Sequence, residues 1–320
     1  MRVIAWPGDQ PESLPCCVAT LGVFDGVHLG HARVIERTLA EAGKRACGAT
    51  IVTFDREPTS LLRAHVQPAI TSLDHRVRLF EGMGVDLCVV VNFTEEIARM
   101  SAEAFAQEVF RELLGARLLV LGFDCRFGRD REGGPELCRR LGFGVVTVSP
   151  VELHGRPVSS TAIRQAIRAG EFRQAARLLG RPFSLYGTVV HGDGRGRRLG
   201  YPTANLDLHN ETVPPSGVYA SLAYTDGEPL PAVTSVGVRP TFHEEPGAEM
   251  VVEVHLIDYE GELYGQDLEV QFVEHLRDQE TFGGAGGLRK QIERDVENAR
   301  MVLARGDMEL HGPPADEGTV

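Results

Sequence analysis

Lysine is almost missing from this 320-residue sequence, which contains only Lys44 and Lys290. Neither lies in a glycine-rich loop, so a P-loop site, in which a lysine reaches the nucleotide phosphates, is excluded. No apolar run is long enough to span a bilayer. Residues 1–15 mix charged side chains with proline and fit no signal or transit peptide. We therefore expect a cytoplasmic protein without a membrane partner.

Closely spaced cysteine pairs of the metal-binding type are also missing. All cysteines fall in the first half of the chain, several of them inside apolar runs, and no Cys-x-x-Cys occurs. They are Cys16, Cys17, Cys47, Cys88, Cys125 and Cys138. We expect reduced thiols in or near the core, and neither a zinc site nor a disulfide framework.

Basic residues are scarce in the second half of the chain. The net charge is −12, and it divides into +2 for residues 1–182 and −14 for residues 183–320. Nucleic acids need a basic face for their phosphates, so we expect no nucleic-acid partner. Where a side-chain cation meets phosphate, that cation must be arginine. The length fits about two domains, and the sequence leaves an oligomer open.

The first part of the chain alternates short apolar strands with amphipathic helices. Strands are predicted at 18–24, 49–54, 87–91, 118–122 and 145–148, and helices at 31–42, 73–83, 102–114 and 136–141. This pattern predicts βαβ units and a Rossmann-like α/β domain with a parallel sheet. Ligands of such sheets bind at the carboxyl ends of the strands.

The pattern changes after two more helices, at 161–169 and 172–179. Strands at 185–190, 217–224, 232–238, 250–257 and 268–272 follow one another with short turns, before a helix at 288–304. Consecutive strands predict an antiparallel Greek-key β-barrel. We place one domain at residues 1–182, a second at 183–306, and a disordered tail at 307–320.

The sequence His28-Leu29-Gly30-His31 stands where the first strand passes into a helix. Gly30 allows an anion to approach the backbone, and the first amides of the helix favour phosphate. The imidazoles of His28 and His31 can donate hydrogen bonds to a phosphoryl oxygen without attacking it. The motif therefore predicts a grip on a nucleotide triphosphate.

A second candidate site for phosphate begins at Ser159-Ser160-Thr161, with Arg164 on the first helical turn. Such a sequence is more often a plain helix cap. Together with the histidine motif we interpret it as a second source of phosphate donors. The loop after the strand at 118–122 carries aromatic side chains that could stack on a ring system, or it is an ordinary βα loop.

The second domain opens with a glycine- and arginine-rich stretch at residues 192–205. Its glycines permit close approach to phosphates, and Thr203 and Asn205 offer hard oxygen ligands for Mg²⁺. Farther on, Glu253 and His255 share one face of the predicted strand at 250–257. A carboxylate there could take a proton from an attacking hydroxyl, although an isolated strand glutamate is usually only solvated.

Over residues 16–303 these motifs resemble the bacterial bifunctional riboflavin kinase/FAD synthetases. Residues 22–31 resemble the adenylyltransferase signature, residues 158–164 its second nucleotide motif, and residues 199–205 the kinase motif. The resemblance implies that riboflavin is phosphorylated by ATP to FMN, and that FMN is then adenylylated by ATP to FAD with release of pyrophosphate. Mg²⁺ would accompany ATP, and no tightly bound cofactor is required.

The resemblance also implies roles for individual residues. Glu253 would be the general base of the kinase, and His28 and His31 the catalytic pair of the adenylyltransferase. The adenylyltransferase would bind ATP through Gly22, Phe24, Asp25, Gly30, Ser160, Thr161 and Arg164, and flavin through Asp55, Glu57, Phe123, Arg126 and Phe127. The kinase would bind ATP through Gly192, Gly194, Arg195, Gly200, Pro202 and Thr203, flavin through Arg277, and the metal through Thr203 and Asn205.

Three alternatives stay open. In the run Phe54-Asp55-Arg56-Glu57-Pro58, a carboxylate stands where the family has a neutral or cationic polar residue. Its charge would repel anionic FMN and ATP, so one alternative is a riboflavin kinase with a weak or inactive adenylyltransferase domain. A second is a non-catalytic flavin-binding regulator. A third, a class I aminoacyl-tRNA synthetase, also needs a lysine-rich motif that this chain lacks.

Overall fold

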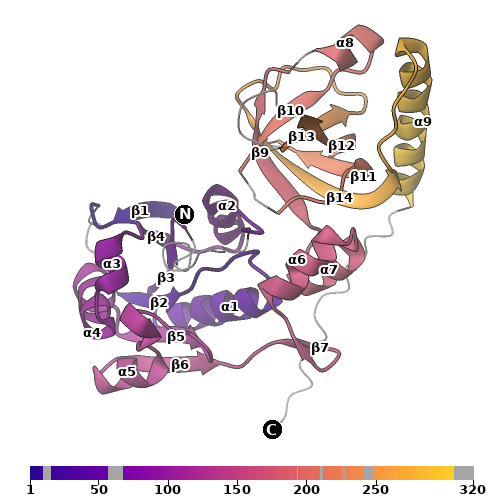
Figure 1. Ribbon diagram of the computed structural model, residues 1–320. Helices are drawn as coiled ribbons and strands as arrows, with labels where there is room; N and C mark the ends of the chain where they lie inside the picture. Colours follow the sequence, from indigo (N-terminus) through magenta and orange to yellow (C-terminus); the bar gives the residue numbers. More distant parts are fainter. Residues whose placement is uncertain are drawn as a thin grey trace. The chain divides into compact units, whose positions relative to one another are not determined.

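The computed structural model describes residues 1–9, 16–56, 68–192, 194–209, 212–225, 228–240 and 248–305 (Figure 1). Its contacts divide the chain into two units, Met1–Ser160 and Thr161–Val320. Glu57 and residues 307–320 lie outside the described ranges. The sequence prediction put the boundary after residue 182. The structure divides α6 (Ser160–Arg168) after its first residue and groups α7 (Phe172–Leu179) with the second unit, where Phe172 stacks on Phe183 and Phe272.

The first unit is built on a parallel sheet in the order β1-β4-β3-β2-β5-β6. Its strands are β1 (Arg2–Trp6), β2 (Cys17–Leu21), β3 (Gly48–Phe54), β4 (Leu87–Val91), β5 (Leu118–Gly122) and β6 (Gly144–Val148). Its helices are α1 (Leu29–Gly43), α2 (Leu73–Gly82), α3 (Glu95–Arg99), α4 (Ala102–Phe105), which continues as a π-helix (Ala106–Leu113), and α5 (Pro135–Arg140). The central strands β2 and β4 are buried at every position, as the continuous apolar runs predict. The sequence reading missed β1, whose first two residues are exposed.

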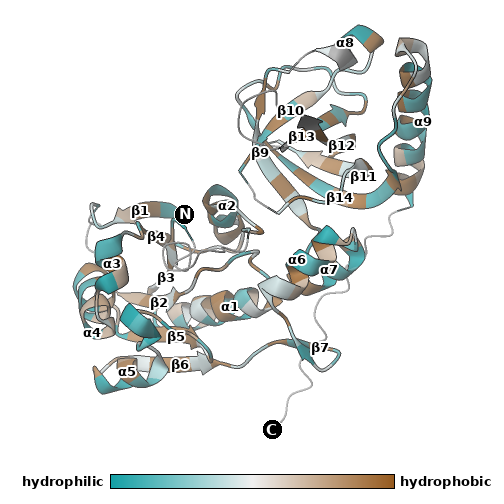
Figure 2. Cartoon of the chain, in the orientation of Figure 1, coloured by the Kyte–Doolittle hydropathy of each residue, from teal (hydrophilic) through white to brown (hydrophobic). Residues whose placement is uncertain are grey.

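The second unit contains a closed antiparallel barrel in the order β10-β13-β12-β11-β14-β9. Its strands are β9 (Ser184–Val190), β10 (Ala204–Leu208), β11 (Gly217–Tyr224), β12 (Leu230–Pro240), β13 (Ala248–Leu256) and β14 (Asp267–Arg277). Helix α9 (Ala285–Ala304) packs on β11, β12 and β14, and alternates hydrophilic and hydrophobic residues along its length (Figure 2). The predicted fold class, a parallel α/β domain followed by an antiparallel barrel with a terminal helix, is confirmed.

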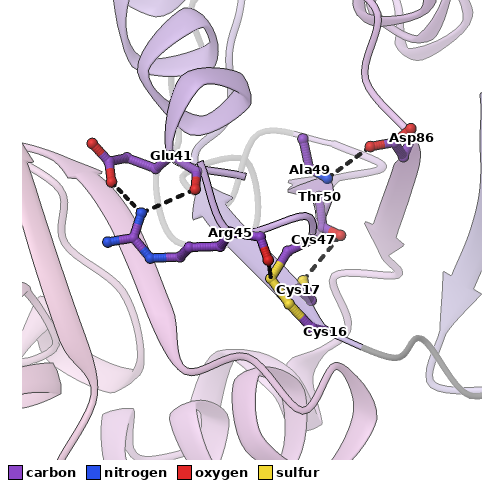
Figure 3. Close-up of a disulfide and its surroundings, with 8 residues drawn as sticks. All are labelled: Cys16, Cys17, Glu41, Arg45, Cys47, Ala49, Thr50 and Asp86. Carbon is purple, nitrogen blue, oxygen red and sulfur yellow. Dashed lines mark hydrogen bonds and ion pairs between the residues drawn. A yellow bond between two sulfur atoms is a disulfide. The ribbon is translucent and has the colours of Figure 1, made fainter. Parts of the chain in front are cut away.

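The cysteine prediction is wrong for one pair, because Cys16 and Cys47 form a disulfide (Figure 3). β2 and β3 run in parallel with Cys17 opposite Gly48. The two residues that precede this pair therefore meet, with their Cα atoms 4.9 Å apart. The other four cysteines are free thiols. Burial raises the pKa of Cys17 and Cys138 to about 11 and that of Cys88 and Cys125 to about 12, as expected of core thiols.

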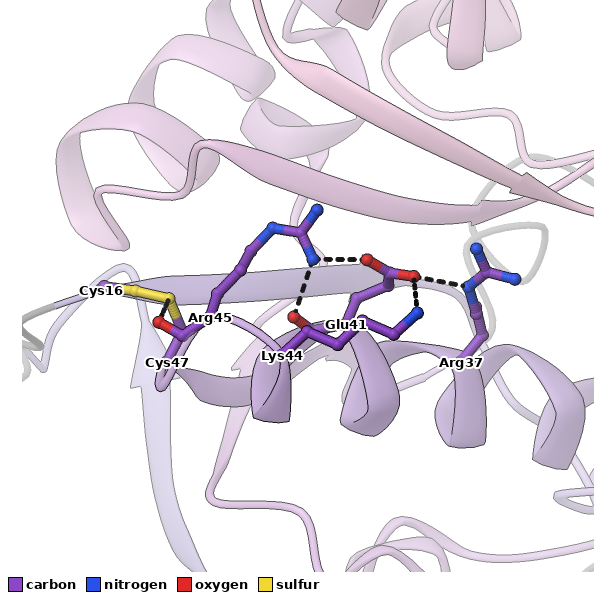
Figure 4. A network of polar contacts seen from close by, with 6 residues as sticks. All are labelled: Cys16, Arg37, Glu41, Lys44, Arg45 and Cys47. Carbon is purple, nitrogen blue, oxygen red and sulfur yellow. Dashed lines mark hydrogen bonds and ion pairs between the residues drawn. A yellow bond between two sulfur atoms is a disulfide. The ribbon is translucent and has the colours of Figure 1, made fainter.

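The end of α1 is held by a charged cluster around Glu41 (Figure 4). Its carboxylate accepts hydrogen bonds from Lys44 at 3.0 Å, from Arg37 at 3.0 Å, and from Arg45. The bonds from Lys44 and Arg45 lower the pKa of Glu41 to about 2. The cluster and the disulfide therefore fix the end of α1 that lies opposite its histidines.

Reduction of the Cys16–Cys47 disulfide is expected to lower the melting temperature of the protein. The bond closes a ring with a sequence separation of 31 that holds all of β2 and α1, and such rings contribute roughly 2–4 kcal/mol. Calorimetry with and without dithiothreitol measures the shift. The double variant Cys16→Ser/Cys47→Ser should melt at the lower temperature in both buffers. An unchanged melting temperature of the reduced wild type would contradict the prediction.

Candidate active sites

His28 and His31 stand together at the first turn of α1. His28 caps the helix, because its Nδ1 accepts a hydrogen bond from the backbone N–H of His31 at 3.4 Å. The two rings stack with their centroids 3.6 Å apart. A Cβ on Gly30 would lie 3.1 Å from Cε1 of His28, so glycine leaves room for this ring. The pair occupies the helix terminus at which amide groups and dipole favour an anion.

The turn before His28 has an unusual backbone. Phe24 and Val27 have positive φ angles of 53° and 41°, which side-chain-bearing residues rarely adopt. The carboxylate of Asp25 accepts hydrogen bonds from the backbone N–H groups of Ile70, at 2.8 Å, and Thr71, at 3.1 Å. These two hydrogen bonds from Ile70 and Thr71 therefore help to hold the turn in its conformation.

Phe24 and Gly22 also help to define the conformation of this turn. The Phe24 ring is buried and packs edge-on against His31 and Phe80, with centroid distances of 5.3 and 5.7 Å. A Cβ on Gly22 would lie 3.1 Å from that ring. Phe24 thus supports the imidazole of His31 from the core side.

A buried arginine that the sequence reading missed fixes the same turn. Arg76 lies in α2 and is 4% exposed. Its NH1 group donates to the carbonyl of Val23 at 2.5 Å and to Oγ1 of Thr53 at 2.9 Å, and its NH2 group donates to the carbonyl of Phe54 at 3.0 Å. Burial lowers the pKa of Arg76, and the nearby charge of Asp25 opposes this shift. An arginine in an amphipathic helix gives no sequence signal for such burial.

The predicted second phosphate motif includes Ser160, the last residue of the first unit. Its hydroxyl donates to the backbone carbonyl of Asp25 at 3.1 Å, which ties the start of α6 to the histidine turn. Thr161, which is exposed, and Arg164, which is buried, follow in α6 as the first residues of the second unit. Their roles toward ATP stay predictions.

The predicted flavin-side residues differ in how far their side chains are exposed to solvent. Phe127 is 5% exposed and packs on Phe105 and Phe110, so its ring belongs to the hydrophobic core. Phe123 is 51% exposed and is the aromatic side chain that this loop presents outward. Arg126 is also exposed, and its guanidinium donates to the carbonyl of Cys125.

Asp55, at the end of β3, has structural partners. Its Oδ1 accepts hydrogen bonds from the backbone N–H groups of Phe93, at 2.8 Å, and Arg56, at 2.9 Å. Its Oδ2 pairs with Nε of Arg56 at 3.0 Å. Asp55 therefore joins the loops that follow β3 and β4. Glu57, whose charge motivated the weaker-adenylyltransferase alternative, lies outside the described residues.

In the barrel, three polar residues form a row across neighbouring strands. Asn205 of β10 pairs directly with Glu253 of β13, and Glu253 pairs with Ser235 of β12. Residues directly opposite one another in a ladder share a face of the sheet. Because Val252 and Val254 are fully buried, this row lies on the outer face of the barrel. Ser235 was not predicted, because the sequence does not give the register in which β12 pairs with β13.

The glycine-rich stretch lies against this row. A Cβ on Gly192 would overlap the side-chain amide of Asn205, and one on Gly196 would overlap the carbonyl of Tyr201 and lie 3.1 Å from Oγ1 of Thr203. The backbone therefore approaches both predicted metal ligands closely. Gly196 is part of the short helix α8 (Arg195–Leu199).

The ends of α8 need glycine for a separate reason. Gly194 and Gly200 cap the helix in left-handed conformations, with φ angles of 63° and 89°.

A hydrogen bond of 2.8 Å joins Nδ1 of His255 to the carbonyl of Pro202 and fixes the glycine-rich stretch to β13. The side chain of Arg195 lies outside the described structure.

Arg277 makes a bidentate ion pair. Its Nε and NH2 groups bind the carboxylate of Asp295 in α9 at 2.8–3.1 Å, and Asp295 is 2% exposed. Gln291 donates to the same carboxylate at 2.9 Å. The pair anchors α9 to the end of β14. This contact accounts for Arg277 without a flavin, so its predicted role in flavin binding stays a prediction.

The described residues contain neither a helix that could span a membrane nor a cluster of metal-binding side chains. Within the residues that the structure describes, none of the helices has the length and apolar character needed to cross a bilayer. In the same residues, His, Cys, Asp and Glu side chains form no cluster of three that could hold a metal.

A parallel α/β sheet and a β-barrel, each with a candidate phosphate site, are the features expected of a two-domain transferase. Comparison with known proteins gives the family. Residues 10–162 match the model of the FAD synthetase family, and residues 179–303 match that of riboflavin kinase.

Full-length relatives agree with both matches. The bifunctional riboflavin kinase/FMN adenylyltransferase of Pseudomonas fluorescens is 37% identical over 90% of this chain and 93% of its own. The Escherichia coli K12 protein of the same description is 36% identical over 89% and 92%. This chain belongs to the family of bifunctional riboflavin kinase/FMN adenylyltransferases, as its motifs predicted.

A solved structure has the same fold over nearly the whole chain. It comes from Streptococcus pneumoniae and is described as a macrolide-efflux protein. It covers 94% of this chain and 99% of its own, with 32% identity and a TM-score of 0.79.

Gly192→Ala is expected to slow the kinase reaction by at least about tenfold, because a Cβ would displace the side chain of Asn205. FMN formation from riboflavin and ATP measures the effect. Gly286→Ala is the matched control, since a Cβ there meets nothing within 4 Å. Equal rates for the two variants would show that the close approach of Gly192 is not needed.

Proposed function

We propose that the barrel phosphorylates riboflavin and that the α/β unit adenylylates the product, each with ATP as donor. The observation that carries the kinase assignment is the direct pairing of Asn205 with Glu253, with Gly192 against the Asn205 amide. The pairing supports a kinase site, because a carboxylate then lies beside the glycine-rich stretch on one face of the barrel. The cytoplasmic location stays a prediction.

In the kinase step, Glu253 accepts the proton of the ribityl 5′-hydroxyl as that oxygen attacks the γ-phosphorus of ATP. The bond from the γ-phosphorus to the bridging oxygen breaks, and ADP and FMN form. Thr203 and Asn205 would hold Mg²⁺, which neutralises charge on the phosphates when bound. The backbone of the glycine-rich stretch lies close to both residues, so it positions the transferred group.

In the adenylyltransferase step, an FMN phosphate oxygen attacks the α-phosphorus of a second ATP and pyrophosphate leaves. The attacking group is already ionised, so no protein nucleophile or base is required. His28 and His31 donate hydrogen bonds to the phosphate oxygens as charge develops, at a helix terminus that favours anions. The resemblance of residues 158–164 to the second nucleotide motif assigns Ser160, Thr161 and Arg164 to the phosphates of ATP.

The test is a product assay with riboflavin and MgATP in which FMN and FAD are separated. We expect FMN to appear first and FAD to follow, and supplied FMN to give FAD directly. FMN alone would favour the kinase with an inactive adenylyltransferase domain, as the charge of Glu57 suggests. Flavin binding without ATP turnover would favour the non-catalytic regulator and overturn the proposal.

Glu253→Gln is expected to lower the rate of FMN formation by roughly 10²–10⁴-fold, because the amide cannot accept the proton. Conversion of FMN to FAD should stay near the wild-type rate. Glu228→Gln changes the same charge at an exposed position and serves as the control. If Glu253→Gln lowered both activities equally in a folded protein, the assignment of two separate sites would be wrong.

A further inference from the structure

Arg76 is a buried arginine of the first unit that the proposed chemistry does not use. The side chain has five N–H donors, and the structure gives it four hydrogen bonds. Besides those to Val23, Thr53 and Phe54, its Nε donates to the carbonyl of Ser72 at 3.4 Å. With these bonds made and 4% of the residue exposed, Arg76 binds protein and not substrate.

Its partners lie at one place in the fold. The β2–β3 ladder ends at the pair Leu21–Val52, and the N–H of Gly22 still reaches the carbonyl of Val52 at 3.1 Å. The ladder of paired residues stops there. The guanidinium then bonds to the carbonyls of Val23 and Phe54 and so joins both chains to the first turn of α2.

The turn that follows Val23 needs such support. Phe24 and Val27 hold positive φ angles, and strained residues keep such angles only where their surroundings fix them. The segment that precedes α2 supplies a second set of bonds, because Ile70 and Thr71 bind the Asp25 carboxylate and Thr71 accepts the N–H of Gly26 at 2.8 Å. Residues 70–76 therefore hold the turn before His28 in place through hydrogen bonds to Val23, Asp25 and Gly26.

We propose that Arg76 is a positioning residue of the adenylyltransferase step, which holds residues 23–27 in the conformation that presents His28 and His31 to the nucleotide. This inference rests on the proposed function of the first unit. Displacement of a stabilising group by about 1 Å can cost on the order of 10²-fold in rate. Loss of the guanidinium should therefore affect turnover more than ATP binding.

The experiment compares Arg76→Met and Arg76→Lys with the wild type for adenylylation of supplied FMN. We expect kcat of Arg76→Met to fall about 30- to 100-fold, with KM for ATP within about threefold. Arg76→Lys should recover part of the loss, because an ammonium reaches single carbonyls but lacks the planar fork. Arg78→Met, an exposed position of the same helix, is the control and should keep the wild-type kcat.

Thr53→Val keeps the test decisive if Arg76→Met does not fold. The Thr53 hydroxyl donates to the carbonyl of Val23 at 3.2 Å and accepts from Arg76, so its removal loosens the same contact. We expect a fall in kcat of about three- to tenfold. Riboflavin phosphorylation by the barrel, measured on the same samples, should stay within about twofold of wild type and reports that the second unit is intact.

The outcomes separate the two proposals. A wild-type protein that forms no FAD would overturn the proposed function and this inference together. A wild type that forms FAD, with folded variants that keep its kcat and only melt at lower temperature, would overturn the positioning role alone. A rise in KM for ATP with unchanged kcat would also overturn it.

Discussion

Backbone pairing between strands decides where the functional side chains of both units stand. In the barrel, the pair Asn205–Glu253 brings an amide and a carboxylate from distant parts of the chain to one outer face. A slip of one residue would turn one of them into the barrel interior. In the parallel sheet, the pairing of β2 with β3 sets the level at which both strands end, and the histidine turn begins there.

The two candidate phosphate sites are built in different ways. The first unit presents imidazoles on a helix terminus, and the strain of the preceding turn is balanced by Asp25 and Arg76. In the barrel, glycine backbone lies close to the candidate ligands: a Cβ on Gly192 would overlap the Asn205 amide, and one on Gly196 would lie 3.1 Å from Oγ1 of Thr203. Positioning and charge stabilisation are the main contributions that phosphoryl and nucleotidyl transfer require of a protein.

Several motif residues contact other parts of the protein and thereby support the structure of a candidate site. The carboxylate of Asp25 binds backbone amides, Phe127 lies in the core, and Arg277 pairs with Asp295. The disulfide between Cys16 and Cys47 belongs to the same class of contacts, since it ties the starts of the two strands whose far ends carry the adenylyltransferase residues. Motif membership alone does not separate a ligand contact from such support, because both constrain the residue type.

By itself the sequence determined the fold class, the order of the two domains and the identity of His28, His31, Thr203, Asn205 and Glu253 as the candidate site. Local periodicity, glycine spacing and motif order carry that information. Only the tertiary structure decided which residues meet: the Cys16–Cys47 pair, Ser235 beside Glu253, and Arg76 across the ends of β2 and β3. These contacts depend on strand register and on burial, which are set by residues far apart in the chain and leave no local pattern.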